Sequence, residues 1–96
     1  MRLSTSDLNI IKSSYKNCKI KGNIWLFGSR VDNNKKGGDI DLFIEAIEEF
    51  KFIDQIKFLT KLERMGIQRK VDLIVQNPNS AQQEIYGIAK QEGVKL

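Results

Sequence analysis

The feature that most limits the possible fold is a pair of segments in which aliphatic residues alternate with acidic or polar ones. The segment "DIDLFIE", residues 39–45, has an aliphatic side chain at every second position, and "RKVDLIVQN", residues 69–77, repeats the pattern. Successive side chains of a β-strand point to opposite faces of its sheet, so a period of two indicates a strand. Both segments are therefore predicted to be strands with one aliphatic face and one face that carries aspartate.

The other apolar segments have different periods. Apolar residues spaced by three and four predict a helix over about residues 6–18, which Ser4 or Ser6 could cap, and a second helix over residues 48–65 that Gly66 ends. A short apolar run at residues 24–27 stops at a Gly-Ser turn and predicts a buried strand. A capping-box pattern at residues 80–83 predicts the start of a last helix, which Gly93 closes.

This order of helix, strand, strand, helix, strand and helix predicts an α+β fold. We expect a small mixed sheet with its helices packed on one face, the aliphatic one, so that the aspartate face stays open. The chain has 96 residues, and no stretch rich in Pro, Gly or Ser divides it. A single domain over residues 1–96 is therefore predicted.

Composition excludes several kinds of chemistry. The chain has no histidine, which excludes Ser-His-Asp and Cys-His catalysis and histidine metal sites, and Cys18 is its one cysteine, which excludes an internal disulfide. A net charge of +4 attracts nucleotides weakly, but without an arginine-rich stripe or an aromatic platform direct nucleic-acid binding is not expected. No signal peptide or membrane span is recognisable, so a cytoplasmic protein without a membrane partner is predicted.

The candidate catalytic and metal-binding residues are the aspartates of the two alternating segments. Asp39 and Asp41 point to the same side of a strand, roughly 7 Å apart at their Cα atoms, and would repel each other unless a cation lay between them. Oxygen ligands of this kind suit Mg²⁺ or Mn²⁺. If the strand of Asp72 lies beside theirs, three carboxylates share one site, and Asp72 could also accept the proton of an attacking hydroxyl.

A phosphate site is predicted next to these acids. Gly28 allows a close backbone approach after the first strand, the Ser29 hydroxyl adds a donor, and Arg30 with the lysines at 35 and 36 could neutralise charge. Each element also has a plainer interpretation, as a turn, a solvated strand face or a solubilising loop, and Arg69-Lys70 as charged residues that flank a strand. The occurrence of all elements in order, each on its own predicted strand, favours the site.

The motifs "FGSR", "GGDIDLFI" and "RKVDLIV" together resemble the signature of the DNA polymerase β-type nucleotidyltransferase superfamily. Chain length, the opening helix and the ending "IAKQEGVKL" resemble its minimal nucleotidyltransferases, which include antitoxins paired with HEPN-domain toxins. The resemblance implies a polymerase β palm-like fold and metal ligands at Asp39, Asp41 and Asp72. It also implies a triphosphate grip by Gly28 and Ser29, and AMP transfer from ATP to a tyrosine of the partner toxin.

The chain departs from this pattern in one loop, and a second hypothesis stays open. Many relatives carry a further arginine and a glycine where this chain has residues 31–34. The first hypothesis is a metal-dependent protein adenylyltransferase, and the alternative is an antitoxin of weak or no activity that neutralises its partner by binding. Phe50, Phe52 and Phe58 exceed what one helical stripe can bury, which favours a partner surface, and a hetero-oligomer and a homodimer are both open.

Overall fold

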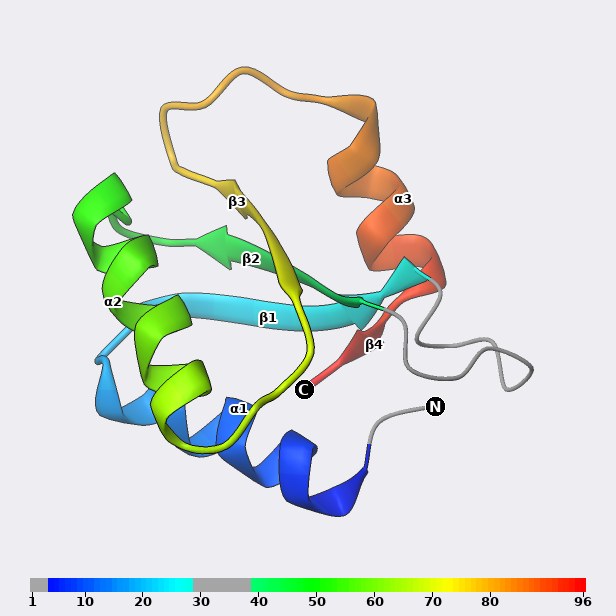
Figure 1. Cartoon of the computed structure of the whole chain (residues 1–96). Coiled ribbons are helices and arrows are strands. Elements are labelled where there is room, and N and C mark those ends of the chain that lie inside the picture. Colours follow the sequence, from blue (N-terminus) through cyan, green and yellow to red (C-terminus); the bar gives the residue numbers. More distant parts are fainter. Residues whose placement is uncertain (1–3, 29–38) are drawn as a thin grey trace.

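The protein is described by a computed structural model that covers residues 4–28 and 39–96. Its elements are α1 (Thr5–Asn17), β1 (Gly22–Phe27), β2 (Ile40–Ala46), α2 (Phe52–Arg64), β3 (Val71–Gln76), α3 (Glu84–Glu92) and β4 (Val94–Lys95), shown in Figure 1. The α+β class and the small mixed sheet are confirmed. In the described ranges no helix is long and apolar enough to cross a membrane.

The four strands lie in the order β3-β2-β1-β4. β1 pairs antiparallel with β2 on one side and with β4 on the other, whereas β2 and β3 are parallel. Parallel neighbours need a crossover connection, and the segment that contains α2 supplies it. The sequence pattern did not predict β4, because two residues at the end of a helix carry no recognisable period.

The main core lies on the aliphatic face of the sheet. The inward residues of β1 and β2, which include Ile24, Leu26 and Leu42, pack with Ile11 of α1 and Phe58 of α2. All five are buried. The amphipathic stripes of both helices are thereby covered, as their spacing predicts.

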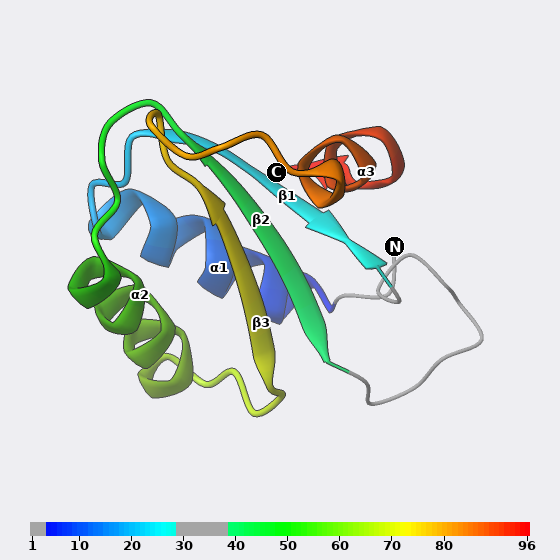
Figure 2. The ribbon, with the colours of Figure 1, turned by 90° about the horizontal axis from the view of Figure 1, so that it is seen from above.

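The opposite face holds a second, smaller core, and here the expectation of helices on one face is wrong. Phe43 lies in this core with Phe27, and Tyr86 and Ala89 of α3 cover them. Figure 2 shows α1 and α2 on one side of the sheet and α3 on the other. The physical reason is that the aspartate face also carries Trp25 and Phe43, whose rings lie tilted to each other with their centres 5.6 Å apart. Such an aromatic patch is stabilised when it is shielded from water.

Two helix starts differ from the predicted ones. Helix α2 begins at Phe52 instead of residue 48, since the backbone of Phe50 is bonded by the side chain of Asn77. The capping box at residues 80–83 does not form, because the Ser80 hydroxyl accepts the backbone N–H of Asn77 and helix α3 starts at Glu84. The first helix does begin as expected, with the Ser4 hydroxyl accepting from the N–H of Asp7.

Asn77 connects the end of β3 to the segment that precedes α2. Its Oδ1 accepts the N–H of buried Phe50 at 2.6 Å, and its Nδ2 donates to the Phe50 carbonyl at 3.1 Å. Gln55 donates to the same carbonyl at 3.3 Å. The turn between β2 and α2 is thus held by side-chain bonds instead of by a helical cap.

We expect Asn77→Ala to lower the free energy of unfolding by about 1–3 kcal/mol, because the buried N–H of Phe50 loses its acceptor. Urea denaturation followed by circular dichroism measures the change. The matched control is Asn79→Ala at an exposed position two residues on, which should stay within about 0.5 kcal/mol of the parent. Equal stability of the two variants would contradict the role assigned to Asn77.

Candidate functional site

The register of the parallel strand pair brings two of the predicted site residues together. Asp41 of β2 lies directly opposite Asp72 of β3. Neighbouring strands are about 4.8 Å apart, and paired residues of parallel strands point to the same face. Asp41 is half-buried, and the Asp72 side chain is 46% exposed. Two carboxylates therefore stand side by side at an edge of the face that water can reach.

Asp39 lies one residue before β2 begins and is exposed. Within residues 4–28 and 39–96, no three acidic, histidine or cysteine side chains are gathered closely enough to hold a metal ion. The described geometry thus consists of a pair of carboxylates on the sheet, with Asp39 at the start of the strand next to them. The assignment of all three as ligands stays a prediction.

Gly28 lies beside Asp41, directly after β1, the strand that pairs antiparallel with β2. Phe27 is the register partner of Asp41, so the residue after it passes beside the Asp41 side chain. Gly28 has φ +75°, and a Cβ added there would overlap the Asp41 carboxylate, with the carboxyl carbon at 3.0 Å. Gly28 is needed here for two reasons, because it takes the left-handed conformation and leaves the space that Asp41 fills.

The rest of the predicted phosphate loop lies outside the described residues. This applies to Ser29 and Arg30 and to residues 31–38, among them both lysines of the loop. Their part in the site stays a prediction. The two described residues that flank this loop both lie near Asp41. Gly28 is in contact with its carboxylate, and Asp39 is two residues before it in the sequence.

Lys70 is a site residue that the sequence pattern missed. Its Nζ lies 3.5 Å from Oδ1 of Asp72. The Lys70 carbonyl accepts the N–H of Ile40 at 2.9 Å, so the β2–β3 pairing extends to Lys70. The spacing of Lys70 and Asp72 could have indicated this contact, because residues two apart on a strand point to the same face. The sequence alone indicates only a charged residue that flanks a strand.

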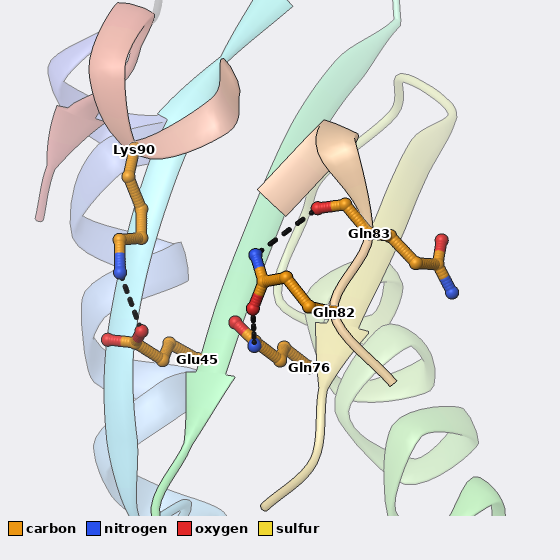
Figure 3. A network of polar contacts seen from close by, with 5 residues as sticks. All are labelled: Glu45, Gln76, Gln82, Gln83 and Lys90. Carbon is orange, nitrogen blue, oxygen red and sulfur yellow. Dashed lines mark hydrogen bonds and ion pairs between the residues drawn. The ribbon is translucent and has the colours of Figure 1, made fainter. Parts of the chain in front are cut away.

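The aspartate face changes in character along the strands. The carboxylates lie at one end, Phe43 and Ile74 follow under α3, and the polar side chains of Glu45 and Gln76 end it. Figure 3 shows this far end, where Lys90 of α3 pairs with Glu45 at 2.8 Å. Gln76 donates to Gln82 at 3.1 Å in the same view. Helix α3 is thereby joined to the far end of the face, and it covers the aromatic residues at the middle of the face.

The donor set fits a divalent ion that a substrate helps to hold. Mg²⁺ is usually bound by one or two carboxylates together with substrate phosphates and waters, rather than by a complete protein cage. Asp41 and Asp72 supply the two carboxylates. Asp72 already forms an ion pair with one cation, the Lys70 ammonium. Such an ion would neutralise the phosphates of a nucleotide and polarise the bond to be broken.

The described residues also contain a groove that borders the site and a tyrosine whose pKa is shifted. A groove of about 540 Å³ runs between the end of α2 and the start of β3, and its lining includes Lys70 but none of the three aspartates. Burial raises the pKa of the Tyr15 hydroxyl, which lies on α1 against Phe58. Tyr15 belongs to the aliphatic side of the sheet, where it packs against the main core.

Fold and paired acids place the chain in a known class. The family described as polymerase beta, nucleotidyltransferase, matches residues 9–95, which is nearly the whole chain. The protein belongs to this polymerase β-type nucleotidyltransferase family. The predicted site residues lie in the segments that carry the family resemblance, with Gly28 just after β1 and with Asp41 and Asp72 near the starts of β2 and β3.

Solved structures agree with this fold. A crystal structure from Shewanella oneidensis superimposes with a TM-score of 0.72 at 18% identity, over 98% of this chain and 71% of its own. A toxin-antitoxin structure with AMP-PNP gives a TM-score of 0.73 at 22% identity, over 96% of this chain and 72% of its own. A search of curated proteins gave no match.

We expect Gly28→Ala to disturb Asp41, because the new methyl group would overlap its carboxylate and the residue would keep a positive φ. The expected loss in free energy of unfolding is about 1–3 kcal/mol, and the Asp41 carboxyl signal should shift in the NMR spectrum. The control is Gly87→Ala in α3, where an added Cβ meets nothing within 4 Å. That change should be neutral or stabilise by up to about 1 kcal/mol. A Gly28→Ala protein with an unmoved Asp41 signal would refute the packing described.

Proposed function

We propose that this nucleotidyltransferase moves AMP from ATP onto a hydroxyl of a partner protein, most simply a tyrosine of a HEPN-type toxin, and so acts as an antitoxin. The observation that carries the proposal is the pairing of Asp41 with Asp72 beside Gly28, within a chain of the polymerase β-type family. The structural similarity to a toxin-antitoxin structure with AMP-PNP supports the choice of nucleotide and of partner.

The reaction needs only groups that this chain possesses. The acceptor oxygen attacks the α-phosphorus of ATP, the bond from that phosphorus to the bridging oxygen breaks, and pyrophosphate leaves. Asp72, at the half-exposed edge of the site, would take the proton of the hydroxyl. Asp39, Asp41 and Asp72 would together hold Mg²⁺ or Mn²⁺, which supplies charge neutralisation at the phosphates. Gly28, Ser29 and Arg30 would position the triphosphate.

The absence of histidine is consistent with this scheme. A general base must lie within reach of the proton that it removes, and in this chain a carboxylate is the side chain suited to do so at the site. A partner that carries its own acceptor hydroxyl would need no deep substrate pocket. This agrees with the open edge on which Asp41 and Asp72 stand.

We expect the double substitution Asp39→Asn and Asp41→Asn to reduce labelling of a HEPN-type partner by α-labelled ATP by at least about 100-fold, because the metal and phosphates lose their anionic ligands. EDTA should have the same effect on the unchanged protein. A charge-matched control is Glu48→Gln with Glu49→Gln, two exposed residues distant from the site. Labelling that survives in the aspartate variant would refute the catalytic assignment.

A second candidate function, neutralisation by binding alone, is favoured by an apolar surface at the start of α2. It consists of Phe52, Ile53 and Ile56, hereafter the α2 apolar patch. Phe52 is 74% exposed and Ile53 is 54% exposed. Phe50 and Phe58 are buried, so of the three phenylalanines noted in the sequence Phe52 alone is available to a partner. Large apolar side chains that are exposed on neighbouring turns of one helix are typical of interaction surfaces.

The surroundings of the α2 apolar patch indicate the kind of partner. Ile56 also lines a groove whose rim carries Lys57, Lys61 and Arg64. In the described part of the chain none of these three cations takes part in an ion pair. A partner segment with apolar residues flanked by acidic ones would match this surface.

We expect Ile53→Glu to weaken association with the HEPN-type partner by about tenfold or more, because the change puts a charge into the α2 apolar patch. Isothermal titration calorimetry measures the dissociation constant of the complex. The control Val94→Glu, at an exposed position on β4, should bind as the parent does. If Ile53→Glu binds normally, the patch is not the interface. Neutralisation by the Asp39→Asn and Asp41→Asn protein, with no transfer by the parent, would establish binding as the function.

A further inference from the structure

We infer that Lys70 is a positioning residue that serves as a resident counter-cation of Asp72, which a divalent ion displaces when the site is loaded. The inference rests on the proposed function, because it concerns the metal and nucleotide of that site. The observation behind it is the 3.5 Å contact between the Lys70 ammonium and Oδ1 of Asp72.

The Asp41 and Asp72 carboxylates would destabilise each other if no cation were near them. Paired residues on parallel strands hold these side chains at neighbouring positions whether or not a ligand is bound. A positive charge on Asp72 relieves this repulsion. Lys70 can supply it because residues 70 and 72 project from the same side of the strand.

The backbone of Lys70 is fixed, whereas its side chain is free to move. The Lys70 carbonyl accepts the N–H of Ile40, which lies between Asp39 and Asp41 in sequence. Its side chain is 72% exposed, and the pair is open to solvent. Exposed ion pairs of this kind contribute little free energy, so a divalent ion with twice the charge can displace the ammonium readily.

Displacement gives the ammonium a second role. Once the ion occupies Asp72, the lysine remains tethered beside it by the β2–β3 pairing. The complex of a divalent ion with ATP still carries net negative charge on its phosphates, which attract a nearby ammonium. Lys70 should therefore oppose the bare ion and favour the ion when nucleotide accompanies it. A residue that only flanks a strand would do neither.

The test compares Lys70→Gln with the parent in two binding measurements on the full chain. Mn²⁺ alone is titrated by EPR of the free ion, and Mn²⁺ with a non-hydrolysable ATP analogue by calorimetry. We expect Lys70→Gln to bind bare Mn²⁺ up to about fivefold more tightly, the size of one exposed ion pair. It should bind the Mn²⁺–nucleotide complex severalfold more weakly. Lys70→Arg should retain the parent's behaviour in both.

Two controls separate the pairing from a general effect of charge. Lys12→Gln removes the same charge from an exposed position of α1, on the other side of the sheet, and should leave both affinities unchanged. In an Asp72→Asn background, Lys70→Gln should lose its effect on bare Mn²⁺, because the pair no longer exists. An effect that persists in that background would overturn the inference.

Failure of the inference is distinguishable from failure of the proposed function. A parent protein that binds Mn²⁺ and transfers AMP, with Lys70→Gln indistinguishable from Lys12→Gln, would overturn the role of Lys70 alone. A parent that binds Mn²⁺ neither alone nor with nucleotide would overturn both. Circular dichroism of each variant shows that the fold is kept, which the exposure of Lys70 leads us to expect.

Discussion

The parallel pairing of β2 with β3 is the interaction on which the site depends. Its register sets Asp41 against Asp72 on one face and the aliphatic residues of both strands on the other. Because side chains alternate along a strand, a shift of one residue in β3 would place Asp72 in the core and an apolar residue beside Asp41. The main core and the acidic pair are therefore specified by the same hydrogen-bonded ladder.

Much of this arrangement could be predicted from local sequence patterns. The alternation in residues 39–45 and 69–77 identified both site strands and the faces that their aspartates occupy, and the apolar spacing identified α1 and most of α2. The Gly-Ser turn placed Gly28 at the end of β1. These features depend on periods of a few residues, which a single sequence records directly.

The rest depended on contacts between distant segments. Helix α3 covers the aspartate face because Trp25 and Phe43 come together across two strands, and no local pattern reports that pairing. The start of α2 depends on Asn77, which lies 27 residues from Phe50 in sequence. Lys70 joins the site through β-sheet pairing and an ion pair. Ser29 and Arg30 stay predictions, since they lie outside the described residues.

The position of Trp25 gives this protein a built-in optical reporter. It is the chain's one tryptophan, and it lies on the same sheet face as the acidic pair, against Phe43 and with the ammonium groups of Lys90 and Lys95 each 5.9 Å from its ring centre. Both lysines belong to the last two elements of the chain. The emission of a single indole thus follows whether α3 and β4 are seated on the sheet, without any label.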